Sequence, residues 1–92
     1  MAYVYILQSN KNKKYYIGST VDLKRRITEH NNGTGGDFTK VHRPWEIICY
    51  KSIDSIQKAR IEEKKIKSYK GGNAFKKIIS GEVAEWSKAA RC

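Results

Sequence analysis

Tyrosines near the start of the chain are the first residues whose type and spacing could do chemistry. The chain has six, and four of them are Tyr3, Tyr5, Tyr15 and Tyr16. A phenol can exchange protons at an active site, but its ordinary pKa of about 10 means that it needs help from its surroundings. Side chains alternate along a strand, so Gly18 shares a face with Tyr16 and is expected to leave space beside that ring for a phosphate. For Tyr3 and Tyr15 we favour the plainer explanation that aromatic residues suit strands.

A second group of candidates lies on the basic segment that follows. Arg26 and His30 are four residues apart and would share one face of a helix. A guanidinium binds two phosphate oxygens in a fixed fork, and an imidazole exchanges protons near neutral pH. Lys24 and Arg25 are better explained as solvated charges or as contacts to a nucleic-acid backbone. By itself the pair of Arg26 and His30 does not distinguish a site from a solvated basic face.

The candidate metal ligand is a carboxylate on a long helix later in the chain. An apolar stripe that includes Ala59 and Ile66 marks the inner face, and Glu63 lies about 30° from its centre whereas Glu62 lies about 70° away. Glu63 is therefore the inward carboxylate. A buried carboxylate must be paired or must bind a cation. The choice is between a metal ion and a salt bridge to Arg60 or a nearby lysine.

The charge balance favours a polyanionic partner. The chain carries 19 Lys and Arg against 9 Asp and Glu, a formal net charge of +10. Binding to phosphates releases counterions and needs no sequence preference, so nucleic acid is the expected partner. A membrane surface is disfavoured because the basic residues form no amphipathic stripe, and a solvated basic surface is the plain alternative. With no long apolar run or signal peptide in the sequence, we expect a cytoplasmic protein.

These residues must be positioned by a small α+β fold. Alternating segments rich in β-branched and aromatic residues predict strands at residues 2–8, 14–19 and 45–51. Helical periodicity predicts helices at 23–31, 55–70 and 74–79, the last one capped by Asn73. Residues 33–44 read as a loop. The expected architecture is a small three-stranded antiparallel sheet flanked by about three helices.

Several segments together match the motif of a known family. They are Tyr3-Val4-Tyr5-Ile6, Tyr15-Tyr16-Ile17-Gly18-Ser19-Thr20, Asp22-Leu23-Lys24-Arg25-Arg26, His30-Asn31, Pro44-Trp45, and Ala59, Glu63, Ile66 and Lys67. In this combination the chain resembles the GIY-YIG endonuclease family over residues 2–79, in particular its small stand-alone single-domain branch. Val4 departs from the first glycine of the motif. Ser19 stands where excision-repair members carry a lysine.

The resemblance implies a role for each matching position. Tyr5 and Tyr16 match the two motif tyrosines, Arg26 the family arginine, His30 a position held by histidine or tyrosine, and Glu63 the metal-binding glutamate. It implies hydrolysis of phosphodiester bonds with one Mg²⁺ or Mn²⁺ ion, in which Tyr16, alone or with His30, acts as the base and Arg26 neutralises phosphoryl charge. The expected nucleic-acid contacts are Ser19, Lys24, Arg25, Lys67 and Asn73.

The expected function is that of a metal-dependent endonuclease acting on DNA, in repair, recombination or the processing of foreign DNA. No obligate protein partner is evident. One alternative is a catalytically degenerate nucleic-acid-binding module, which would bind in EDTA and cleave nothing. The other is a structural or interaction protein, which would not bind nucleic acid at all.

The end of the chain fits neither the family pattern nor a core periodicity. We expect residues 1–80 to form the nuclease-like domain and residues 81–92 to form a tail outside the core. Residues 81–89 can be written back into codons that look like the start of a bacterial serine transfer RNA gene, so our hypothesis is that this segment was never selected as protein. Untethered terminal residues are usually mobile, so the tail is expected to pack weakly and to be dispensable.

Overall fold

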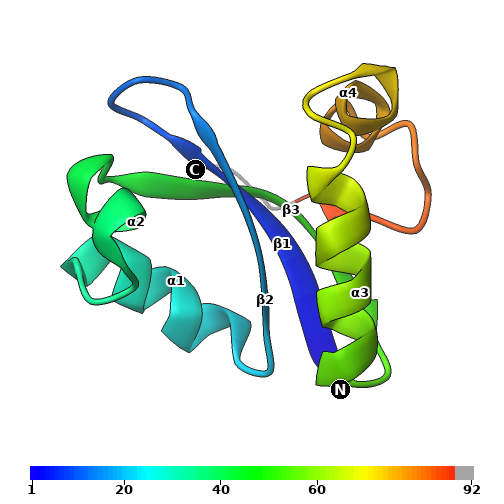
Figure 1. Ribbon diagram of the computed structural model, residues 1–92, viewed down its shortest axis with the longest axis horizontal. Coiled ribbons are helices and arrows are strands. Elements are labelled where there is room, and N and C mark those ends of the chain that lie inside the picture. Colours follow the sequence, from blue (N-terminus) through cyan, green and yellow to red (C-terminus); the bar gives the residue numbers. More distant parts are fainter. Residues whose placement is uncertain (89–92) are drawn as a thin grey trace.

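An antiparallel sheet runs through the middle of the molecule (Figure 1). The structure is a computed structural model that describes residues 1–88. The strand order is β2-β1-β3-β4. Its strands are β1 (Ala2–Ser9), β2 (Tyr15–Thr20), β3 (Trp45–Ile53) and the short β4 (Ser87–Lys88). The prediction of three antiparallel strands is confirmed, and β4 adds two residues beside β3.

Within residues 1–88, four helices complete the α+β fold. They are α1 (Leu23–Asn32), α2 (Asp37–Val41), α3 (Ile56–Lys67) and α4 (Asn73–Ile79). The Asp22 side chain caps α1 by accepting a hydrogen bond from the Arg25 backbone N–H at 3.1 Å, and Gly33 ends it in the left-handed region at φ 84°. The expected N-cap at Asn73 is wrong, because Gly72 holds that position and Asn73 is already helical. The additional helix, α2, lies within residues 33–44, which the sequence predicted to be a loop.

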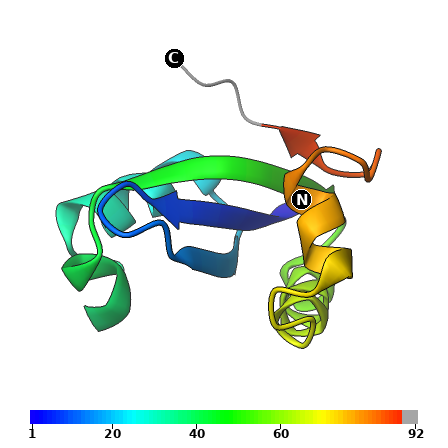
Figure 2. The same cartoon turned by 90° about the horizontal axis from the view of Figure 1, so that it is seen from above.

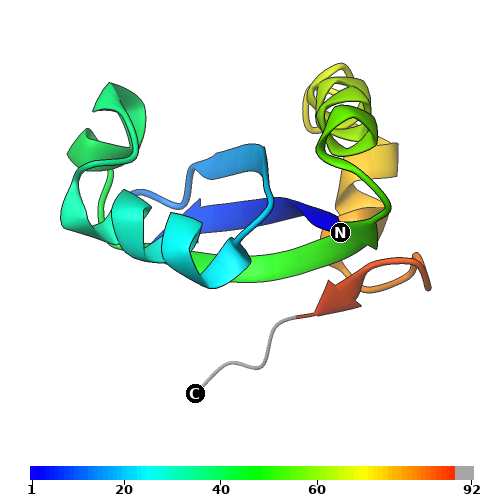
Figure 3. The same ribbon diagram turned by 90° about the horizontal axis from the view of Figure 1, so that it is seen from below.

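Each face of the sheet packs against its own helices. Buried Val4 and Ile6 of β1 belong to one core cluster, with residues of α3 and α4. Tyr5 and Leu7 belong to the other, together with Trp45 and residues of α1. This division follows from the alternation of side chains along a strand. Figures 1 and 3 show β2 lying between α1 and α3, so this outer strand separates the two helices that carry the candidate site.

The segment after α4 packs back onto the domain (Figure 2). Trp86 is only 6% exposed and belongs to the core cluster under α3 and α4. Its neighbour Ser87 pairs with Tyr50 of β3, and Glu85 lies 3.0 Å from Lys51. The expectation of weak packing after Ser80 is therefore wrong for residues 81–88. A single large aromatic side chain buries much apolar surface without any periodic partner, so the absence of periodicity misled the prediction. Residues 89–92 lie outside the described part of the chain.

Candidate active site

Tyr5 and His30 form the buried centre of the candidate site. The phenol oxygen of Tyr5, on the inner strand β1, lies 2.9 Å from His30 Nε2, on α1. The Tyr5 ring crosses Gly18 of β2, where an added Cβ would collide with the phenol oxygen. The predicted phosphate space beside Tyr16 and Gly18 is therefore filled by Tyr5. The absence of a side chain at Gly18 instead allows Tyr5 to reach the outer strand of the sheet.

His30 is held neutral by its surroundings. Its side chain is fully buried, and the backbone of Gly35 packs so closely that an added Cβ there would collide with Nδ1. Within residues 1–88, Nδ1 has no hydrogen-bond partner. Burial, reinforced by the positive charge of Arg26, lowers the pKa of His30 from 6.5 to about 4. At neutral pH the imidazole is uncharged, and its tautomer decides whether Nε2 donates to Tyr5 or accepts from it.

The two motif tyrosines sit in different surroundings. Burial and the neighbouring Tyr16 raise the pKa of Tyr5 to about 12, although Arg26 opposes the rise. Tyr5 therefore stays protonated at neutral pH. Tyr16 is half-buried, with its ring centroid 4.9 Å from that of His30 and 6.0 Å from that of Trp45. Its hydroxyl makes no hydrogen bond within the described chain, so that oxygen is available to a water molecule or a substrate.

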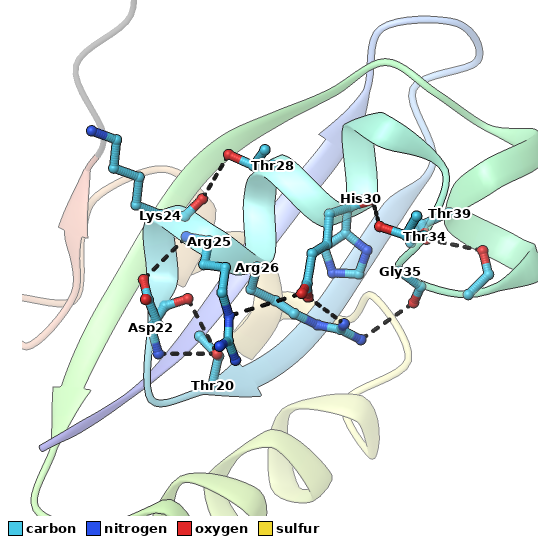
Figure 4. Close-up of polar contacts among 12 residues, drawn as sticks. Thr20, Asp22, Lys24, Arg25, Arg26, Thr28, His30, Thr34, Gly35 and Thr39 are labelled. Carbon is cyan, nitrogen blue, oxygen red and sulfur yellow. Dashed lines mark hydrogen bonds and ion pairs between the residues drawn. The ribbon is translucent and has the colours of Figure 1, made fainter.

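Arg26 is oriented by two groups that the sequence analysis did not identify. Its guanidinium donates to Glu29 Oε1 at 3.0 Å and to the Gly35 carbonyl oxygen at 3.2 Å. Figure 4 shows the guanidinium extending along α1 toward Gly35 and past His30. The side chain of Arg26 is 32% exposed, so part of the guanidinium remains open to a ligand. The spacing of Arg26 and Glu29, three residues apart on a helix, was a signal that could have found this pair.

Glu63 lies on the other side of β2. Its Oε1 accepts a hydrogen bond from Ser19 Oγ at 2.6 Å, and Lys67 Nζ lies 2.6 Å from Oε2. Glu62 instead turns toward β3, where Lys51 Nζ lies 3.4 Å from its Oε2. The carboxylate of Glu63 thus faces the end of β2 and is paired with one of the nearby lysines.

The oxygen atoms at Glu63 and Ser19 suit a hard divalent cation that keeps most of its bound water. No group of three or more His, Cys, Asp or Glu side chains suited to a metal occurs in residues 1–88. Mg²⁺ is commonly bound through one or two carboxylates, with water and substrate phosphates completing the shell. Glu63 and the Ser19 hydroxyl supply such a partial set of oxygen ligands. The ammonium group of Lys67 at the same carboxylate shows that the position accommodates positive charge.

Five of the ten expected site residues line two hollows near the end of β2. One hollow there is lined by Ser19, Arg25, Arg26, Glu29 and Arg60, among others. A second is lined by Arg60, Ile61, Glu63, Lys64 and Lys67. Glu63 is close enough to Tyr5 for its negative charge to raise the pKa of that phenol, which links the two sides of β2.

Two of the expected nucleic-acid contacts do not join this group. Lys24 points away from Arg26 (Figure 4) and lines a separate hollow with Tyr3 and Tyr50. Asn73 is exposed at the start of α4, and no side-chain hydrogen bond connects it to the site residues described here.

A family comparison identifies the family of this chain. The model of the GIY-YIG catalytic domain matches residues 1–78. The chain therefore belongs to the GIY-YIG family. A catalytic domain of this family implies nuclease activity on a nucleic-acid substrate, generally with a divalent metal. None of the helices in residues 1–88 is long and apolar enough to cross a membrane.

Its relatives include small single-domain proteins described as UPF0213 proteins. One from Staphylococcus saprophyticus is 33% identical over 79 residues, which is 86% of this chain and 95% of the relative. Another, from Haloquadratum walsbyi, is 36% identical over 67 residues, or 73% of this chain and 74% of the relative. The solution NMR structure of a UPF0213 protein from Bacillus halodurans superimposes with a TM-score of 0.53 at 28% identity, covering 87% of this chain and 84% of that one.

Proposed function

We propose that this protein is a metal-dependent endonuclease that hydrolyses phosphodiester bonds in DNA. The observation that carries the proposal is the meeting of two groups at the end of β2. The Tyr5–His30 hydrogen bond and Arg26 lie on one side of the strand, and the Glu63 carboxylate lies on the other. A phosphate placed between them would contact a guanidinium, a tyrosine hydroxyl and a cation site together, which suits the hydrolysis of a phosphodiester.

In this proposal the protein side chains divide the work of one hydrolytic step. Tyr16 accepts the proton of the attacking water as the general base. Arg26 binds the phosphoryl oxygens, which gain negative charge in the transition state. Tyr5, with its raised pKa of about 12, keeps its proton and is held in place by His30. Because His30 Nε2 is hydrogen-bonded to Tyr5, the proposal uses Tyr16 alone as the base, which is one of the two forms that the resemblance implies.

Glu63 and Ser19 are the groups that would hold one Mg²⁺ or Mn²⁺ ion. When bound, such an ion supplies stabilisation of the negative charge on the departing 3′ oxygen. Lys67 must then release the carboxylate, and its side chain, which is 52% exposed, has room to turn toward a phosphate. This movement agrees with its expected role as a nucleic-acid contact.

Incubation with defined nucleic acids tests the proposal. Single-stranded, duplex, branched and flapped DNA, and the matching RNAs, are incubated with Mg²⁺, Mn²⁺ or EDTA, and the products are resolved on a denaturing gel. We expect metal-dependent cleavage of at least one DNA substrate, and the Arg26→Ala variant removes it. Failure to cleave any substrate with either metal would contradict the proposal.

A second candidate function is a nucleic-acid-binding module without catalysis. The observation that favours it is that Glu63 is already satisfied by Ser19 and Lys67. In that case Lys67 would take the place of a metal permanently. Binding that is unaffected by EDTA, with no cleavage of any substrate, would identify this function.

A further inference from the structure

Arg60 occupies a position that the proposed mechanism does not use. It lies on α3, three residues before Glu63, so the two Cβ atoms are about 5 to 6 Å apart on one helix face. Its side chain is exposed, and it forms no ion pair or hydrogen bond within residues 1–88. Arg26 and Lys67 nearby are each held by a carboxylate, which leaves Arg60 as a cation free to bind an anion.

Arg60 also connects the two hollows of the site. It lines the hollow that contains Arg25 and Arg26, and it lines the neighbouring hollow of Glu63 and Lys67. The two hollows therefore adjoin at Arg60, one beside α1 and the end of β2 and the other on α3, and together they are called the groove below. In both hollows the cationic side chains outnumber the acidic ones.

We propose that Arg60 binds a backbone phosphate of the substrate strand adjacent to the phosphate that is cleaved. The inference rests on the proposed function, because the position of the cleaved phosphate between Arg26 and Glu63 defines which phosphate is adjacent. A guanidinium is suited to this role because its planar fork binds two phosphate oxygens. Contacts to phosphates fix the register and direction of a nucleic acid without reading its bases. Arg60 is thus a positioning residue that directs the strand along the α3 side of the groove.

Binding measurements in EDTA test Arg60 without requiring cleavage. The affinity of a fluorescent oligonucleotide for the full-length protein is measured by anisotropy over a range of salt concentrations. The matched control is Lys65→Ala, which removes the same charge from the same helix but from a side chain that lines a different hollow, with Tyr69 and Trp86. We expect Arg60→Ala to weaken binding about tenfold and to reduce the slope of log K against log salt by about 0.9 on a duplex, whereas Lys65→Ala leaves the slope unchanged.

The same assay identifies the phosphate that Arg60 binds. Single uncharged methylphosphonate linkages are placed in turn along the oligonucleotide. One position should weaken binding to the wild-type protein but have no effect on Arg60→Ala, because the contact is already lost. Arg60→Lys should restore part of the affinity, since it keeps the charge and loses the fork.

The outcomes separate this inference from the proposed function. Equal losses of slope in Arg60→Ala and Lys65→Ala, or no loss in Arg60→Ala, would overturn the role of Arg60 even if the protein cleaves DNA. A selective loss in Arg60→Ala without cleavage by the wild-type protein would support Arg60 as a phosphate contact but overturn the nuclease, and with it the placing of that phosphate beside a cleaved one. Absence of binding to every oligonucleotide would overturn both.

Discussion

The buried His30 makes the stability of the fold depend on pH. Its pKa is 6.5 in an unfolded chain and about 4 in the folded protein, because burial and Arg26 disfavour the charged imidazole. Between these two pH values His30 is therefore protonated in the unfolded chain and neutral in the folded protein. The contribution of His30 to the free energy of unfolding is fully present above pH 6.5 and is lost as the pH falls toward 4. The difference in pKa corresponds to about 3 kcal/mol in total, of which about 2 kcal/mol is lost between about pH 7 and pH 5.

Urea unfolding at a series of pH values from neutral down to about pH 5, above the ordinary pKa values of carboxyl groups, measures this loss. The variants to compare are His30→Gln and His42→Gln. His42 is the second histidine of the chain and is hydrogen-bonded to Asn12. We expect the wild-type protein and His42→Gln to lose about 2 kcal/mol over this range, and His30→Gln to be nearly flat.

The test rests on how the free energy of unfolding changes with pH, and not on its absolute value. His30→Gln also alters the partner of Tyr5, so it is expected to lower the free energy of unfolding at every pH. If His30→Gln kept the full pH dependence, or if His42→Gln removed it, the reasoning about the burial of His30 would be refuted. An NMR titration of the imidazole protons provides an independent check of the pKa.

Three further predictions concern the site and the end of the chain. Glu63→Gln should lower the cleavage rate by about 10² to 10³, whereas Glu62→Gln should be nearly silent, because only Glu63 faces the groove. Steady-state cleavage with Mg²⁺ measures both, and the reverse pattern would contradict the assignment. Tyr5→Phe should lower the free energy of unfolding by about 1 to 3 kcal/mol, since it leaves His30 without its partner, while Tyr16→Phe should lower kcat by about 10² to 10⁴ with little change in stability. Urea unfolding and kcat for both variants check this, and equal losses of stability would contradict it. Deletion of residues 81–92 should lower Tm by on the order of 10 to 20 °C, because burial of a side chain such as Trp86 is worth about 3 kcal/mol. An unchanged Tm would show that the packing of Trp86 contributes nothing.

Local patterns in the sequence predict the elements that carry the site. Alternation and turn residues locate the three long strands, and helical periodicity locates α1 to within one residue of its end. Helical geometry alone distinguishes Glu63 from Glu62, and the hydrogen bond from Ser19 agrees with that choice. The predictions of the strands and helices succeed because each depends on residues close together in the sequence.

The remaining features depend on contacts between distant residues. The bond between Tyr5 and His30 joins positions 25 residues apart, and nothing in the local pattern selects Tyr5 over Tyr16 as the partner. The five-residue helix α2 is too short to show a helical period. Trp86 belongs to a core cluster whose other members come from β1, β3, α3 and α4, so periodicity within its own segment could not reveal its burial.

The edge position of β2 explains how one site can use residues from both faces of the sheet. β2 is the outermost strand, and in the described part of the chain only β1 pairs with it. Tyr16 and Gly18 face α1, whereas Ser19 faces α3, because adjacent residues of a strand point to opposite sides. The two groups therefore come within reach of one phosphate only near the end of this outer strand, where the hollow of Arg26 adjoins the hollow of Glu63. Tyr5 on the inner strand reaches the same place across Gly18, so a side chain at Gly18 would remove Tyr5 from the proposed site without touching the metal ligands.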